Sequence, residues 1–160
     1  MPSSQASTAR TAALEANAPT MQALDLTKQP PRSPKEELDG LVMLPRTIDK
    51  LRASLPGGNM GAYQIPGFSE SMLEAIGVSE DELRDAVEQA SSDEDVVVWL
   101  RGHADKSKYR EFSERMRNRT LNDLENPARF RERYPIVNER PDLHYLMDVL
   151  EADDRQMFAK

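Results

Sequence analysis

The chain has 160 residues, of which 31% are charged and 38% hydrophobic, and its formal net charge is −7. It has no cysteine and only two histidines, His103 and His144, which excludes disulfides, thiolate catalysis, zinc fingers and multi-histidine metal sites. The negative charge argues against nucleic-acid or anionic-membrane binding by the whole molecule, and the longest apolar run, residues 96–100, is far too short to span a membrane.

The N-terminal segment, residues 1–23, consists mainly of Ser, Ala, Thr, Gln and Pro. It cannot bury enough surface to offset its ordering entropy, so we expect a disordered tail. No apolar segment of the kind that a secretory signal requires develops there. We therefore expect a cytoplasmic protein with a single domain over residues 24–160.

The first helix signals follow the tail. Residues 33–36, Ser-Pro-Lys-Glu, predict a helix start with an N-cap, a first-turn proline and a capping-box glutamate, interrupted at Gly40. A second helix is predicted from Pro45 to about Leu55, where Pro-Gly-Gly ends it. Residues 59–66 then form a loop, with Tyr63 packed on the core.

Three helices are predicted in the middle of the chain. The first spans Phe68–Ile76 and is closed by Gly77, a residue suited to a left-handed C-cap. The second follows a capping box at residues 79–82 and has apolar residues at i, i+3, i+4 and i+7. The third begins at residues 92–95 and runs through the valines, with Trp99 in the core and His103 capping its end.

Three further helices complete the prediction. One is capped by Asp105 or Ser107, a short one runs from Asn126-Pro127 to Pro135, and the last begins at Pro141. About seven short helices indicate a compact all-α single domain, and they are too short for an up-and-down bundle. A chain of this size buries roughly two-thirds of its unfolded surface, which suffices for independent folding.

A basic block covers residues 106–133, which hold nine Lys or Arg and five Asp or Glu. One interpretation is a phosphate-contacting face. In the other, Tyr109, Phe112 and Met116 form a buried stripe and the cations are the solvated side of the same helix. The interleaved glutamates favour the second interpretation.

The most informative segment is the helix predicted from Pro45. Arg46, Asp49 and Lys50 share one face of it. Arg46 lies in the first turn, where the helix dipole disfavours a cation unless an anion offsets it. That anion could be a carboxylate of a distant helix, such as the acidic residues at 151–154, or a bound ligand held by free backbone N–H groups.

Several of these elements resemble a family of uncharacterised bacterial all-helical proteins catalogued as a domain of unknown function. The resemblance rests on Leu44-Pro45-Arg46 with Asp49-Lys50 and Arg52-Ala53, on Pro31-Arg32-Ser33-Pro34, and on Gly61-Ala62-Tyr63, and it covers roughly residues 24–158. It implies that the signature residues of this chain are Arg46, Asp49, Lys50, Arg52 and Tyr63. Residues 65–68, Ile-Pro-Gly-Phe, depart from the more polar run expected there. The resemblance supplies no activity.

Three functions remain open, because the sequence contains no recognisable catalytic, cofactor or metal constellation. The first is a non-enzymatic helical module that binds a protein or ligand, as a monomer or homodimer, through the face carrying Arg46 and Lys50 or through the basic block. The second is a small enzyme or sensor that binds a phosphorylated or carboxylated metabolite at Arg46, Lys50 and Arg52, with Tyr63. The third is RNA or ribosome association through residues 106–133. An exposed cluster of these four residues lining a concavity favours the second function, and their burial in a fully paired network with Glu151, Asp153 or Asp154 favours the first.

Overall fold

A computed structural model describes residues 21–159. The predicted disordered tail lies outside the described residues except for its last three, which contact the domain. The amide of Met21 donates a hydrogen bond to the carbonyl oxygen of Ala90, and the carbonyl oxygen of Gln22 accepts one from Nε of Arg52. The described end of the predicted tail is therefore hydrogen-bonded to the domain.

The described residues form eight α-helices, two short 3-10 turns and one two-stranded hairpin, which confirms the all-α fold class. The helices are α2 (Leu44–Ala53), α3 (Phe68–Ile76), α4 (Glu80–Gln89), α5 (Asp93–His103), α6 (Tyr109–Asn118), α7 (Pro127–Arg133), α8 (Ile136–Glu139) and α9 (Leu146–Phe158). The 3-10 turns are η1 (Lys106–Lys108), which leads directly into α6, and η2 (Leu121–Asp123).

Local capping signals explain where several helices begin and end. Ser79 and Glu82 form the predicted reciprocal capping box of α4. Gly77 ends α3 with φ 77°, the left-handed conformation that glycine adopts without steric cost. The side chain of Ser92 accepts a hydrogen bond from the amide of Asp95 at the start of α5.

The helical start predicted at residues 33–36 is wrong, because a hairpin follows instead. Strands β1 (Glu37–Leu38) and β2 (Leu41–Val42) pair antiparallel with Leu38 opposite Leu41. Asp39 and Gly40 join them with φ values of 54° and 82°, and positive φ at both central residues is the requirement of a type I′ turn. The Asp-Gly pair was the local signal for this turn.

The last helix begins five residues later than predicted, at Leu146. Residues 120 and 145 form an isolated antiparallel bridge, with the amide of Leu146 donating to the carbonyl oxygen of Arg119. This bridge holds the chain extended up to Tyr145. Trp99 is only partly buried and stacks on His103 with ring centroids 4.1 Å apart, while His103 Nδ1 lies 2.7 Å from the carbonyl oxygen of Trp99 near the end of α5.

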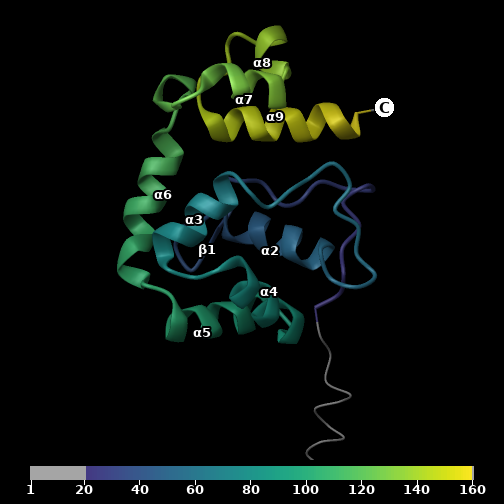
Figure 1. Cartoon of the computed structure of the whole chain (residues 1–160), viewed down its shortest axis with the longest axis vertical. Coiled ribbons are helices and arrows are strands. Elements are labelled where there is room, and N and C mark those ends of the chain that lie inside the picture. The colour runs from purple at the N-terminus through teal and green to yellow at the C-terminus, as the bar shows by residue number, and fades with distance from the viewer. Residues whose placement is uncertain (1–20, 160) are drawn as a thin grey trace, which may run out of the picture.

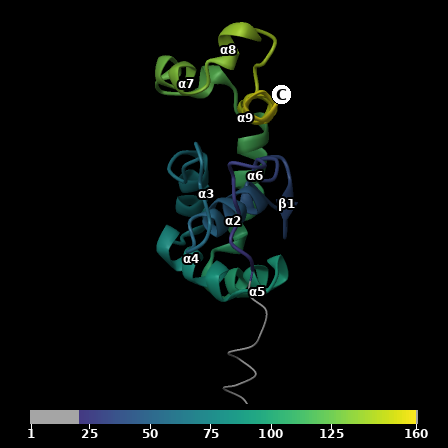
Figure 2. The same ribbon diagram turned by 90° about the vertical axis from the view of Figure 1, so that its right-hand side faces the viewer.

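The elements form three tiers with α2 at the centre (Figure 1). Helices α4 and α5 lie on one side of α2 and α3, while α7, α8 and α9 lie on the other (Figure 2). Helix α6 runs along one edge of the molecule, from the end of α5 toward α7 (Figure 1). Helix α2 is buried along almost its whole length, with Ile48 and Leu51 fully inaccessible in the core. No helix in the described part of the chain has the length and apolar character needed to cross a membrane.

Candidate functional site

The five predicted site residues separate into two groups. Arg46, Lys50 and Tyr63 come together between α2 and the tier formed by α7 and α9, where they line one pocket. Asp49 and Arg52 do not line that pocket. The shared helical face expected for Arg46, Asp49 and Lys50 is thus divided between two environments.

Asp49 belongs to a structural cluster. Its carboxylate accepts hydrogen bonds from the backbone amide of Arg32 at 2.8 Å and from the Arg32 side chain at 3.1 Å. Arg32 also donates to Asp93 at 2.6 Å, and this hydrogen bond raises the pKa of Arg32. Arg52 lies 3.8 Å from Asp49. The cluster ties the segment before β1 to α2 and α5, and it leaves no free charge for a ligand at Asp49.

Arg46 forms a buried pair with Asp154 of α9. The guanidinium nitrogens lie 2.8 and 3.2 Å from the two carboxylate oxygens, and Tyr63 Oη donates to the same carboxylate at 2.7 Å. Arg46 is 3% exposed and Asp154 6%. The structure confirms the pairing predicted between this cation and the acidic end of the last helix. Burial, and then the contact with Asp154, raises the pKa of Tyr63, so its hydroxyl is a permanent hydrogen-bond donor here.

Lys50 lies one turn after Arg46, and it has no such counter-ion. Its Nζ donates to the backbone carbonyl oxygen of Gln64 at 3.0 Å, and it forms no ion pair with any residue among 21–159. The residue is only 9% exposed. Burial lowers the pKa of Lys50 to about 7, and the positive charges of Arg46 and Arg133 add to this effect against the opposing charge of Asp154.

The Lys50 pocket, as we name this cavity, has a volume of about 560 Å³. Helix α7 and the start of α3 supply aromatic rings, with Phe130 centred 6.2 Å from Phe68 and 4.8 Å from Tyr134. Its lining residues come from α2, the loop before α3, α3, α7 and α9: Met43, Arg46, Lys50, Tyr63, Gln64, Pro66, Gly67, Phe68, Glu70, Asn126, Arg129, Phe130, Arg133, Tyr134, Leu150 and Asp153.

Positive charge predominates around this cavity. Besides Arg46 and Lys50, α7 contributes Arg129 and Arg133, both exposed, and neither forms an ion pair within the described range. Arg133 donates to the carbonyl oxygen of Ala62 at 3.2 Å and lies over the Tyr134 ring. The lining carboxyl groups are Glu70, which is exposed, and Asp153, whose pKa is raised by burial and by the adjacent Asp154.

The contribution of α7 was not predicted from the sequence. Arg129 and Arg133 are spaced i, i+4, as are Phe130 and Tyr134, so α7 presents a pair of cations beside a pair of rings. That spacing was the available signal. Its orientation toward α2 depends on packing between segments that are about eighty residues apart.

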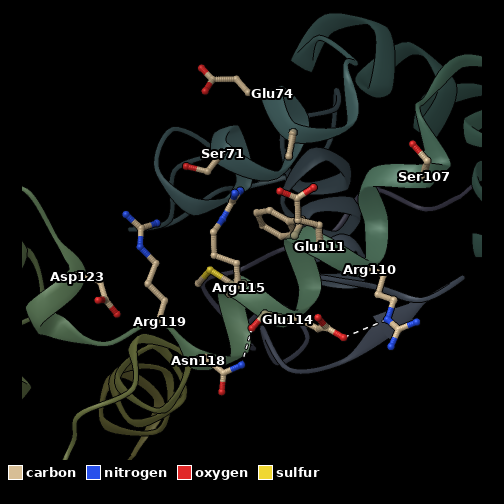
Figure 3. A pocket seen from close by; sticks show the side chains of 13 residues that line it. Ser71, Glu74, Ser107, Arg110, Glu111, Glu114, Arg115, Asn118, Arg119 and Asp123 are labelled. Atoms are coloured by element: carbon tan, nitrogen blue, oxygen red, sulfur yellow. Dashed lines mark hydrogen bonds and ion pairs between the residues drawn. The ribbon is translucent and has the colours of Figure 1, made fainter.

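A second hollow, the α6 groove, lies between α3 and α6 (Figure 3). Arg115 and Arg119 extend toward α3 in this view, and Arg110 pairs with Glu114 at 3.1 Å. Glu74 and Glu111 also line it, so its charge is mixed.

Helix α6, the first part of the basic block, has the buried apolar stripe of the second interpretation, while Arg129 and Arg133 of the same block lie on α7 at the Lys50 pocket. The stripe of Tyr109, Phe112 and Met116 is buried at 2–3% exposure, as predicted. Elsewhere in the block Lys106 pairs with Asp39 and Arg117 pairs with Glu37. The cations of this helix are therefore the solvated side of an amphipathic element, partly neutralised by carboxylates.

Comparison with known proteins places the chain in a family. Residues 28–156 match the family described as a domain of unknown function, DUF5069, and the chain belongs to it. No curated protein matches the chain. The match to DUF5069 confirms the prediction that the chain belongs to a family of uncharacterised domains. No group of three or more His, Cys, Asp or Glu side chains suited to a metal ion occurs among the residues that the structure describes.

Proposed function

We propose that this protein is a ligand-binding module that takes a small anionic compound, a carboxylate or a phosphate, into the Lys50 pocket. The observation that carries the proposal is the burial of Lys50 beside a cavity without a carboxylate partner. A buried ammonium group is costly unless it is paired. A bound anion would supply the missing partner.

The neighbouring charges support the same polarity. Arg46 is neutralised by Asp154, but Arg129 and Arg133 are not paired with any described carboxylate. An anion entering past α7 would meet these two guanidinium groups first and Lys50 next. Arginine binds carboxylates and phosphates through two parallel hydrogen bonds, so either anion suits the site.

The rest of the cavity suits a ligand with an apolar part. Its volume lies within the range of small-molecule sites, which are lined mainly by apolar and aromatic groups with a few polar anchors. Phe68, Phe130 and Tyr134 supply such walls. We therefore favour a small metabolite that combines a negative charge with a hydrocarbon or planar portion over a bare inorganic ion.

Burial disfavours a macromolecular partner at this site. Arg46 and Lys50 are 3% and 9% exposed, so they do not present a charged face to another protein. The residues are neither an open surface cluster nor a fully paired network. Arg46 is paired within the fold, and Lys50 is available to a ligand that enters the cavity.

Thermal unfolding against a panel of carboxylates and phosphorylated metabolites tests this proposal. A ligand at a hundred times its Kd adds about 2.7 kcal/mol, which is a shift of several degrees for a domain of this size. We expect the shift to be larger at pH 6 than at pH 8, since Lys50 is charged below about pH 7.

The matched variants lie on α7. Arg133→Gln, within the pocket, should reduce the shift, and Arg131→Gln should preserve it, because Arg131 is exposed and does not line the cavity. Neither residue is in the core, so both variants should fold. The absence of a shift with every anion, or an equal loss in the two variants, would contradict the proposal.

A further inference from the structure

We infer that the amine of Lys50 forms a reversible imine with the carbonyl carbon of an anionic aldehyde or ketone held in the Lys50 pocket. The inference rests on the proposed function, because the anionic group is what brings the carbonyl compound to α7. It adds a covalent step and a substrate class, namely small compounds that carry both a carbonyl and a carboxylate or phosphate.

The geometry places an amine at the inner side of a charged, ring-lined cavity. Lys50 Nζ makes one hydrogen bond, to Gln64, and lies 6.0 Å from the centre of the Tyr63 ring. An amine that donates a single hydrogen bond and has no carboxylate partner keeps its nitrogen lone pair available once it loses a proton. The paired Arg46, by contrast, is held by Asp154 and Arg32.

Nucleophilic lysines become reactive when burial or neighbouring cations favour the neutral amine. Both conditions hold at Lys50, whose pKa is lowered to about 7 mainly by burial and then by Arg46. A lysine in water is neutral in only about one molecule in 2,500 at pH 7. The charged and titratable groups that face Lys50 or line its pocket are Arg46, Tyr63, Glu70, Arg129, Arg133, Tyr134, Asp153 and Asp154.

The substrate class follows from the arrangement of charges. The guanidinium groups of Arg129 and Arg133 on α7 can hold an anionic group while Lys50 on α2 addresses a carbon within the same cavity. A compound with its anionic group and its carbonyl a few bonds apart can bind the arginines and react with Lys50 at the same time. A neutral carbonyl compound can only react with Lys50, and a simple anion can only bind the arginines.

The step balances without an oxidant or reductant. The lone pair of Lys50 Nζ forms a bond to the carbonyl carbon, and the π electrons of the carbonyl move to its oxygen. One proton passes from nitrogen to that oxygen, which gives a carbinolamine. Asp153 lines the same cavity, and its carboxylate can relay the second proton from solvent water to the carbinolamine oxygen. Water then leaves, and the product is a protonated imine beside the Asp153 carboxylate.

Reductive trapping in the full-length protein tests the inference. Glyoxylate, glycolaldehyde phosphate or neutral acetaldehyde is added with sodium cyanoborohydride, and peptide mapping compares modification of Lys50 with that of the exposed Lys108. We expect Lys50 to be modified at least about tenfold faster than Lys108 by one or both anionic probes and not preferentially by acetaldehyde. Reaction with glyoxylate alone indicates a carboxylate ligand, and reaction with glycolaldehyde phosphate alone indicates a phosphate ligand. Reaction with both indicates a site that accepts either anion.

The pH profile separates the covalent step from simple binding. Trapping at Lys50 should rise about tenfold between pH 6 and pH 8, as the neutral amine fraction increases around a pKa of about 7. Anion binding should change in the opposite direction. Arg133→Gln should reduce trapping by the anionic probe, and Asp153→Asn should slow it, while Arg131→Gln serves as the control.

The thermal shift tests the binding proposal, and the preference for Lys50 in trapping tests the imine. A thermal shift with anions but no preference for Lys50 in trapping overturns the imine and leaves the binding proposal intact. Modification of Lys50 at the same rate as the exposed lysines also overturns the imine. Absence of both the shift and the adduct removes both proposals. Lys50→Met, which keeps an unbranched apolar side chain at this position, should fold and lose the preferential adduct.

Discussion

Replacing Lys50 with methionine should stabilise the protein, and the gain should diminish as the pH rises. The reason is that the fold lowers the pKa of Lys50 from 10.5 to about 7, mainly through burial. Between those two values the unfolded chain binds more protons than the folded one, so the stability of the wild type increases with pH in this window. Methionine has no such proton equilibrium.

The magnitude follows from the size of the shift. A difference of about 3.5 units at 1.36 kcal/mol each places an upper limit of about 5 kcal/mol on the cost of the ammonium group at pH 6, and about 1 kcal/mol remains at pH 9.5. The variant also loses the hydrogen bond to Gln64, which is worth about 1 kcal/mol. We therefore expect a net gain of up to about 4 kcal/mol at pH 6 and almost none at pH 9.5.

Urea denaturation at pH 6, 7, 8 and 9.5 measures this difference, because groups that titrate alike in both proteins cancel. Lys108→Met is the control, since Lys108 is exposed and has no ion pair within the described residues. Its variant should match the wild type at every pH. A gain for Lys50→Met that is independent of pH would refute the reasoning, as would a loss of stability at pH 6.

Three other predictions concern the stability of the fold, two at the Arg46–Asp154 pair and one at two glycines. Arg46→Met and Asp154→Leu should each lose about 3–5 kcal/mol in chemical denaturation, and the double variant should lose less than either single one, because each single change strands a buried charge; additive losses would contradict this. Tyr63→Phe should lose about 1.5–3 kcal/mol by the same assay, since it removes a hydrogen bond to the Asp154 carboxylate, and an unchanged midpoint would show that the hydroxyl is dispensable. Gly40→Ala should cost about 1–2 kcal/mol of stability because Gly40 has a φ of 82°, whereas Gly102→Ala within α5 should gain about 0.5–1 kcal/mol. Thermal melts in which both variants shift the midpoint in the same direction would contradict this prediction.

Helix boundaries that depend on neighbouring residues could be predicted from the sequence. Gly77 and the capping box at Ser79 are local devices, and the structure places both where the sequence indicates. The hairpin at Asp39-Gly40 was equally local and was missed because the Ser-Pro-Lys-Glu motif before it resembles a helix start. The late start of α9 could not be predicted locally, because Tyr145 is held by a bridge to Thr120.

The candidate site was only partly accessible to the same reasoning. The isolated first-turn cation Arg46 pointed to a distant carboxylate, and Asp154 lies 108 positions away in the chain. The sequence did not distinguish Asp49, which pairs with Arg32, from its helix neighbour Lys50, which pairs with no described carboxylate. That distinction depends on which elements pack against each side of α2, and side-chain spacing within one helix does not determine it.

The pattern of partners along α2 supports the proposed ligand site. Thr47 donates to the carbonyl oxygen of Met43 at 2.7 Å, Asp49 is held by Arg32, and Arg46 is held by Asp154. Thr47 and Asp49 are thus satisfied in the way that folded proteins require, and Arg46 is satisfied at both terminal nitrogens, while its buried Nε has no hydrogen-bond partner. Among the buried charged residues of this helix, Lys50 alone lacks a partner of opposite charge in the described structure. It lines the cavity to which α7 contributes two arginines and which four aromatic rings also line. Arg46, one turn earlier, is paired with a carboxylate of the fold, whereas the carboxyl groups that line the cavity, Glu70 and Asp153, form no ion pair with Lys50. Lys50, the charged residue without a counter-ion, lines the cavity, and the proposed anionic ligand would supply that counter-ion.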